Sequence, residues 1–292
     1  MRGTAFLAVV LSFAISAGAQ TNVGLALDEV TDNRVAMGDL TGFLSLRVKL
    51  TGSGLDKALA ARVIVKEAKD DRGTSLTDGS DKPDFFAREY NNGTLNFQVK
   101  QPARAASSVR LKGTIELYVP ARDPAAIVKV SKALSKLDTP LTAAGLKTAK
   151  LTITPLSVKG YSAQLDSHKL DDKKIAELRA EGKKRGVPDD EIEKMIGLAK
   201  AMEGLNEQPQ EGMVILSGTK ADFDRIYRVE ILGDDGKPID VGSRSTSTRG
   251  DDATLMTMQP QKPPPANAAL EFFVLTDKSR LSFPFDLKVT LP

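Results

Sequence analysis

Side chains that commonly carry enzymatic catalysis are scarce in this chain. There is no cysteine, and His168 is the single histidine among 292 residues. A serine, histidine and aspartate system would therefore have to use His168, with Asp166 or Asp171 as the carboxylate that orients the imidazole. No serine is surrounded by the residues of a nucleophile elbow. These observations favour an exposed loop position for His168, and we predict no catalytic residue.

Metal and cofactor sites are limited by the same composition. One imidazole without any thiolate cannot complete a usual zinc site. Calcium needs only oxygen ligands, so it stays open. Five pairs of adjacent aspartates could supply such oxygens: Asp70-Asp71, Asp171-Asp172, Asp189-Asp190, Asp234-Asp235 and Asp251-Asp252. None has the alternating ligand spacing of a calcium-binding loop, and we predict no metal site and no cofactor.

Paired carboxylates of the kind used in glycoside hydrolysis remain an alternative, because the two partners can lie far apart in a sequence. Glu116 and Glu271 occupy matching places in two similar stretches of the chain. Each falls on the outward phase of its expected strand, where a solvated sheet face explains a carboxylate without any catalytic role. The alternative function is therefore an envelope hydrolase that uses dispersed carboxylates or His168.

The two similar stretches contain the same blocks in the same order. The matching blocks are Leu50–Gly52 with Leu216–Gly218, Ala61–Val65 with Tyr227–Ile231, Thr94-Leu95 with Thr254-Leu255, and Ile115–Val119 with Leu270–Val274. A repeated order of strand, turn and strand predicts two domains of similar all-β architecture.

Alternation of apolar and polar residues identifies the expected strands. In Phe43–Leu50, leucine and valine occupy one face while serine, arginine and lysine occupy the other. Phe283 and Phe285 flank Pro284, which indicates an edge strand or a bulge. Further strands of the second half are expected at Lys150–Val158 and at Ile239–Val241. Such short strands between turn clusters are typical of a sandwich. We predict a mainly β protein with two immunoglobulin-like β-sandwich domains in tandem, residues 22–147 and 148–292. The architecture resembles that of exported immunoglobulin-like modules of bacteria, which implies no activity.

A helical-hairpin insertion is expected at residues 169–204 of the second domain. The first helix begins at Asp171 or Asp172 and runs through Lys184 before Gly186, and the second begins at Pro188. The apolar stripe of the second helix consists of Ile192, Met195, Ile196, Ala199 and Met202. Either this stripe covers the second sandwich or the neighbouring helix, or it is a surface for a partner protein.

The N-terminus has the features of a signal peptide at residues 1–19. Arg2 supplies positive charge, an apolar run follows, and Ala17-Gly18-Ala19 offers small residues for cleavage. The apolar run is shorter than the about 20 residues that span a bilayer. We therefore expect a soluble exported protein, periplasmic or extracellular, with no integral membrane segment after cleavage.

Charge and aromatic content narrow the choice of partner. Lysine and arginine number 41 against 38 acidic residues, and the two signs are interspersed along the chain. Basic residues are not gathered around aromatic platforms, so we predict no nucleic-acid partner. The favoured interpretation is a non-enzymatic binding or structural module of the bacterial cell envelope, with another envelope or extracellular protein as its partner.

Overall fold

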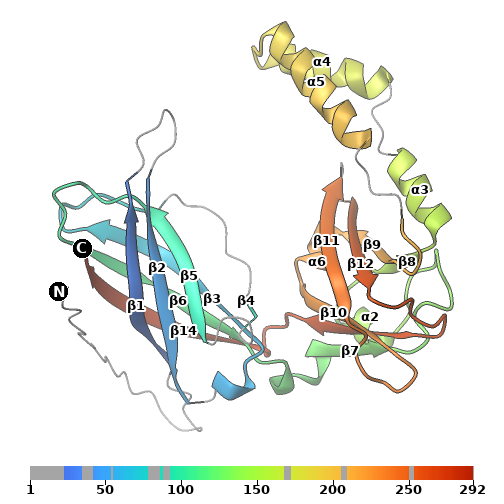
Figure 1. Ribbon diagram of the computed structural model, residues 1–292, viewed down its shortest axis with the longest axis horizontal. Helices are drawn as coiled ribbons and strands as arrows, with labels where there is room; N and C mark the ends of the chain where they lie inside the picture. The colour runs from blue at the N-terminus through green and yellow to red at the C-terminus, as the bar shows by residue number, and fades with distance from the viewer. Residues whose placement is uncertain are drawn as a thin grey trace. The chain divides into compact units, whose positions relative to one another are not determined.

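The computed structural model describes residues 23–34, 42–53, 55–77, 86–87, 93–167, 172–204, 209–249 and 253–291. Within these residues the protein is mainly β, and its strands form four sheets whose neighbouring strands run antiparallel (Figure 1). The β class predicted from alternating side chains is therefore confirmed.

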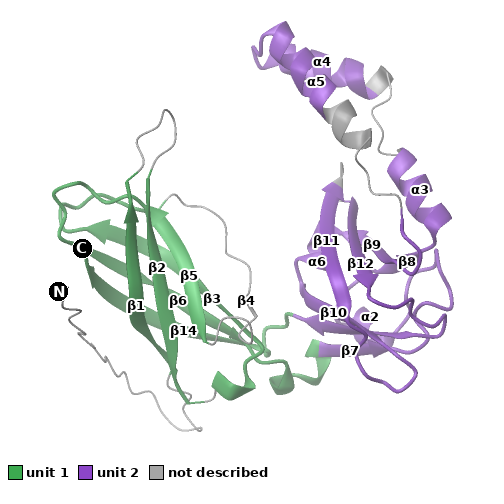
Figure 2. Cartoon of the chain, in the orientation of Figure 1, with its two compact units in different colours: residues 1–126, 275–292 green, residues 127–274 purple. Residues whose placement is uncertain are grey.

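The chain forms two compact units (Figure 2). Unit 1 consists of Met1–Ala126 and Leu275–Pro292, and unit 2 consists of Ile127–Val274. Unit 2 is thus inserted into unit 1, which differs from the predicted tandem division at residues 147 and 148. Periodicity shows which face of a strand is buried, but it does not show which strand lies beside it. The last segment of the chain could therefore not be assigned to unit 1 from its pattern.

Unit 1 contains two sheets. The sheet with the order β1-β2-β5 is made of β1 (Val23–Asn33), β2 (Phe43–Gly52) and β5 (Thr94–Lys100). The sheet with the order β14-β6-β3-β4 is made of β14 (Arg280–Thr290), β6 (Ser108–Tyr118), β3 (Ala60–Asp70) and β4 (Phe86–Ala87). Three short 3-10 turns accompany them, η1 (Leu55–Lys57), η2 (Pro120–Arg122) and η3 (Pro124–Ala126).

The core of unit 1 is built from the inward faces of these sheets. Leu44, Leu46 and Val48 of β2 are fully buried, as the alternation of this segment predicts. Val48 belongs to the same apolar cluster as Ile115 and Leu117 of β6. Both sheets therefore contribute apolar side chains to one cluster, and their burial stabilises the unit.

Strand β14 is at the edge of its sheet and pairs with β6 over its whole length. An edge strand has one side without ladder hydrogen bonds, which explains how it accommodates Pro284, as predicted. Phe285 lies directly opposite Gly113 of β6. A Cβ at residue 113 would lie 2.7 Å from Cε1 of Phe285 and 2.1 Å from the Ile64 carbonyl oxygen. Glycine is therefore required here because the aromatic ring and a neighbouring backbone occupy the space.

Unit 2 also contains two sheets. Their orders are β11-β12-β9-β8 and β10-β13-β7. The strands are β7 (Ile127–Val130), β8 (Thr154–Leu156), β9 (Val214–Thr219), β10 (Ile226–Leu232), β11 (Val241–Arg249), β12 (Ala253–Pro260) and β13 (Ala269–Val274). Helices α2 (Ala144–Thr148), α3 (Val158–Ser167) and α6 (Lys220–Phe223) lie between them in the chain.

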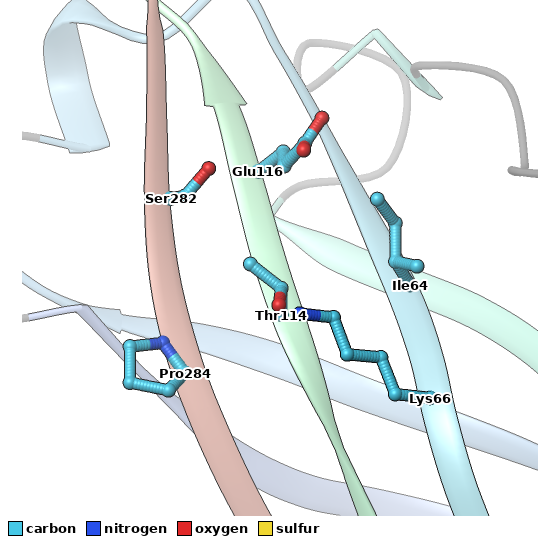
Figure 3. Close-up of a pocket in the computed structure, with 6 residues that line it drawn as sticks. All are labelled: Ile64, Lys66, Thr114, Glu116, Ser282 and Pro284. Atoms are coloured by element: carbon cyan, nitrogen blue, oxygen red, sulfur yellow. The ribbon is translucent and has the colours of Figure 1, made fainter.

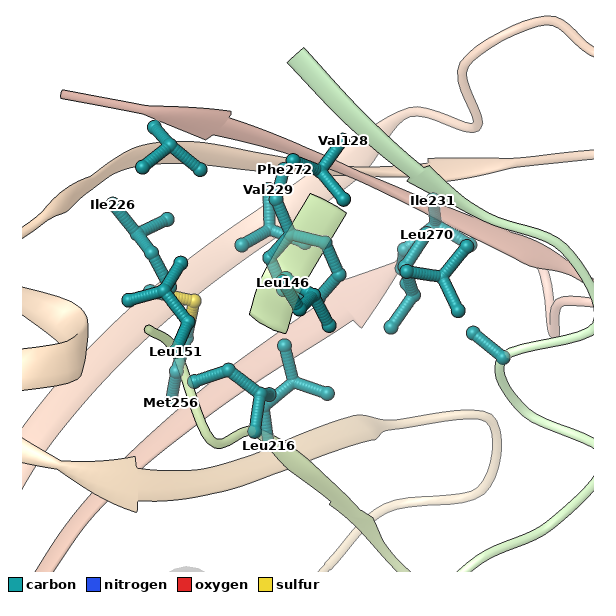
Figure 4. Close-up of a cluster of buried hydrophobic side chains, with 14 of the residues drawn as sticks. Val128, Leu146, Leu151, Leu216, Ile226, Val229, Ile231, Met256, Leu270 and Phe272 are labelled. Atoms are coloured by element: carbon teal, nitrogen blue, oxygen red, sulfur yellow. The ribbon is translucent and has the colours of Figure 1, made fainter. Parts of the chain in front are cut away.

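The main core of unit 2 joins its two sheets and α2 (Figure 4). Leu216 of β9, Phe272 of β13 and Leu146 of α2 are fully buried in this cluster. A second, smaller cluster contains Tyr161 of α3 with Ile215 and Leu255. Ile215 and Leu216 are adjacent in β9 and belong to different clusters, so this sheet is covered on both faces.

Two elements of unit 2 differ from the sequence expectation. Val158, expected to continue a strand, begins helix α3. Strand β11 extends to Arg249, although apolar residues predicted only its start around Ile239–Val241. Residues 242–248 are exposed and mostly serine and threonine, so no apolar phase marks them as a strand.

The repeated blocks occupy strands with equivalent neighbours. Blocks of the first stretch lie on β2, β3, β5 and β6, and those of the second on β9, β10, β12 and β13. In unit 1, β2 pairs with β5 and β3 pairs with β6; in unit 2, the equivalent β9 pairs with β12 and β10 pairs with β13.

The register of the second pair differs between the two units. Arg62 is opposite Glu116, whereas the matching Arg228 is opposite Phe273, two residues beyond Glu271. A shift of two residues leaves every side chain on the same face of its sheet.

Candidate functional site

The segment between α3 and β9 holds two helices, α4 (Asp172–Lys184) and α5 (Asp189–Gly204). Gly186 has a φ of 75° and ends α4 at the predicted place. Gly186 N–H donates to the Lys183 carbonyl, and Val187 N–H donates to the Gly182 carbonyl, both at 3.0 Å. This pattern is a Schellman motif, which satisfies the last carbonyls of the helix. Acidic residues in the first turn of α5 complement the positive end of its dipole.

The helical pair has an apolar core of its own. Ile175 of α4 and Ile192 and Ile196 of α5 are at most 5% exposed, and Val187 packs against them. Gly182 permits this approach, because a Cβ there would lie 2.6 Å from Cδ1 of Ile192. Two of the five residues predicted to form a partner surface, Ile192 and Ile196, therefore lie inside the pair rather than on its surface.

The helices also expose large apolar side chains. Met195 and Leu198 of α5 are 66% and 64% exposed, and Leu178 of α4 is 46% exposed. Met195 and Leu198 have the highest exposures among the large hydrophobic residues that the structure describes. The side chains of Ala199 and Met202 lie outside the described residues. Leu198 is absent from the predicted apolar stripe, although its three-residue spacing from Met195 is a usable signal.

We call Leu178, Met195 and Leu198 the exposed apolar set. Met195 and Leu198 lie three residues apart on one helix, so a single partner surface can contact both side chains. They extend from the same helix as Ile192 and Ile196, which are fixed in the hairpin core. The charged residues between the helices are already paired, since Arg179 donates to Glu193 at 2.6 and 3.0 Å. The set can therefore offer apolar contact but no reactive group.

A second candidate is a shallow hollow of about 420 Å³ on the outward face of the β14-β6-β3 sheet (Figure 3). Its lining residues are Ile64, Lys66, Thr114, Glu116, Ser282 and Pro284. Arg62 donates to one carboxylate oxygen of Glu116 at 2.9 and 2.6 Å, and their side chains are only 11% and 14% exposed. Glu116 therefore forms a largely buried ion pair and is not a free general base in this hollow.

The carboxylates considered for hydrolysis do not come together. Glu116 belongs to β6 of unit 1, and Glu271 belongs to β13 of unit 2, where it is opposite Glu230. His168 and Asp171 lie outside the described residues, and Asp166 is an exposed residue near the end of α3. Among the residues that the structure describes, no three or more His, Asp or Glu side chains are grouped so that they could hold a metal ion.

The aspartate pair at residues 70 and 71 organises a loop. Asp70 is 6% exposed and accepts hydrogen bonds from the backbone N–H groups of Arg72, Thr74 and Ala103. Burial alone would raise the pKa of Asp70, but these three donors outweigh it and hold the pKa below its usual value. Asp71 accepts from Ser107 at 2.5 Å. Both carboxylates therefore accept hydrogen bonds from within the protein and hold the loop that follows β3.

A comparison of the chain with protein-family models, with curated proteins and with solved structures finds no match. Among the described helices, none combines the length and the apolar character needed to cross a membrane.

Proposed function

We propose that this protein is an exported, non-enzymatic binding module of the bacterial cell envelope, and that the α4–α5 pair contacts its protein partner. Two immunoglobulin-like sandwiches serve as the scaffold in this proposal, and the helical pair is an insertion between strands of the second. The N-terminal 19 residues act as the export signal, and the mature protein works in the periplasm or outside the cell.

One observation carries the proposal, the exposure of Met195 and Leu198 on a helix that already has its own core. A buried partner contact stabilises a complex by about 1.5–3 kcal/mol for each such side chain. Methionine adapts to varied apolar surfaces, which suits a contact with another protein. Ile192 and Ile196 hold the two helices together, so the exposed apolar set is presented on a folded pair.

The test is capture of an envelope protein by the full-length chain and by the double variant Met195→Ser with Leu198→Ser. We expect the variant to retain less than about a tenth of the captured partner, because two apolar contacts are lost. The captured protein is quantified by mass spectrometry from matched envelope extracts.

The matched control is Glu191→Ser with Lys194→Ser, which alters two exposed polar residues of the same helix. This control should capture the partner as well as the unaltered chain does. Equal loss in both variants would show that the helix fold matters and not the exposed apolar set. Unchanged capture by the Met195 and Leu198 variant would exclude this set as the contact.

A further inference from the structure

The final strands of the two repeats are exchanged. Strand β7 follows β6 in the chain, yet it pairs with β13 of unit 2. Strand β14 follows β13 in the chain, yet it pairs with β6 of unit 1. In the repeat, β6 and β13 are equivalent strands, because Ile115–Val119 matches Leu270–Val274. The strand that follows each repeat therefore pairs with the other repeat: β7 pairs with β13, and β14 pairs with β6.

We infer that the chain is a tandem duplication with reciprocally exchanged last strands, and that β6 also accepts β14 from a second copy of this chain. The sequence repeat supports the duplication, and the strand pairing supports the exchange. A duplication without exchange would pair β7 with β6 and β14 with β13. The observed pairing replaces both of these neighbours at once, as a reciprocal exchange requires.

The segments that follow β6 and β13 explain why the chain does not fold back. Pro120 and Pro124 lie between β6 and β7, where proline favours extended backbone in the preceding residue and removes N–H donors. A tight hairpin turn from β6 into β7 is therefore disfavoured. After β13, Thr276 donates to Asp123 at 2.6 Å, and Val119 N–H donates to the Ser279 carbonyl at 2.7 Å. These bonds direct the chain into β14 beside β6.

The edge of β6 therefore depends on a strand that arrives from the end of the chain. β14 brings Val289, which is fully buried, together with the partly buried Phe283, Phe285 and Leu287. A β14 strand from a second copy would make the same side-chain contacts and the same ladder, so the partner is a second copy of the same chain. Only the course of residues 275–279 would differ, and mass action then sets the fraction exchanged.

The test uses the absence of native cysteine. Thr114→Cys with Pro284→Cys places two thiols directly opposite each other on β6 and β14. Lys49→Cys with Thr94→Cys is the matched control, since these residues are opposite on β2 and β5, which do not exchange. Each full-length variant is unfolded, refolded at about 10 and about 100 µM, oxidised and run on a non-reducing denaturing gel, because mass action governs exchange.

We expect the β6–β14 pair to form a cross-link within one chain at the lower concentration. At the higher concentration the fraction of covalent dimer should rise about tenfold, whereas the control pair stays within one chain at both. Absence of any cross-link between residues 114 and 284 would contradict the exchange within the chain. Absence of dimer at both concentrations, or an equal dimer fraction in the control, would contradict acceptance of β14 from a second copy.

Discussion

At the scale of single residues, Gly113 shows how a small side chain permits a close contact between strands. The ring of Phe285 on β14 covers this glycine of β6, and the Ile64 carbonyl oxygen of β3 lies beside the same Cβ position. An aromatic ring placed over a strand glycine shields the exposed backbone and supplies the missing side-chain packing. This contact packs β14, the last strand of the chain, against β6 within the β14-β6-β3-β4 sheet.

We predict that Gly113→Ala lowers the free energy of unfolding by about 1–3 kcal/mol, because the added methyl group overpacks this position. Urea unfolding followed by circular dichroism measures the loss. Gly197→Ala on α5 is the control, since nothing lies within 4 Å of a Cβ there. It should stabilise the helix by about 0.5–1 kcal/mol, through the lower conformational entropy of alanine in the unfolded chain. Unchanged stability of Gly113→Ala would mean that Phe285 does not cover this glycine.

At the scale of elements, the α4–α5 pair is a small structural unit with its own core. Ile175, Ile192 and Ile196 form a cluster separate from those of the two sheets. A core of this size gives little stabilisation beyond the cost of ordering two helices. The pair should therefore respond to a core substitution without any effect on the strands.

We predict that Ile192→Ala destabilises the pair by about 2–5 kcal/mol, because the lost methyl groups leave a cavity against Gly182. Hydrogen exchange followed by mass spectrometry should show lost protection in residues 172–204 and unchanged protection in β9 and β12. Leu198→Ala is the control, and its 64% exposure predicts no such loss. Protection lost equally in the strands would show that the helices and the sheets fold as one cooperative unit.

At the scale of the whole molecule, unit 1 contains segments from both ends of the chain, because the C-terminal strand β14 pairs with β6. Val289 is fully buried with Val109 and Leu111 of β6. In the tandem division this residue would belong to the second domain, whereas the observed pairing places it in unit 1. The two assignments predict opposite consequences for a substitution near the C-terminus.

We predict that Val289→Asp destabilises unit 1 by about 3–5 kcal/mol, because the carboxylate would be buried without a partner. Hydrogen exchange should increase in β3 and β6 and stay unchanged in β9, β12 and β13. Lys288→Asp is the control, since this neighbouring side chain is exposed and its replacement should alter stability by less than about 0.5 kcal/mol. Increased exchange in β9 and β12 instead would support the tandem division.

Local patterns in the sequence were sufficient for most strands and for the two helices at residues 172–204. The alternation in β2 reflects burial of Leu44, Leu46 and Val48 on one face, and Gly186 ends α4 because it adopts a positive φ. Helical spacing also places Met195 in the apolar stripe of α5, but its exposure does not follow from that spacing. Strand β11 was missed beyond Val241, because exposed serine and threonine leave no apolar phase.

Strand partners and the division into units came from tertiary structure. Ile192 and Met195 belong to the same apolar stripe, yet one is 4% and the other 66% exposed. Ile192 packs against Gly182 and joins the cluster with Ile175, whereas Met195 is outside that cluster. β14 likewise has the alternation of a strand in either unit, and its pairing with β6 follows from contacts across more than 160 residues. The spacing of apolar residues shows which face of a strand or helix is buried. Contacts between residues far apart in the sequence determine which element packs against that face.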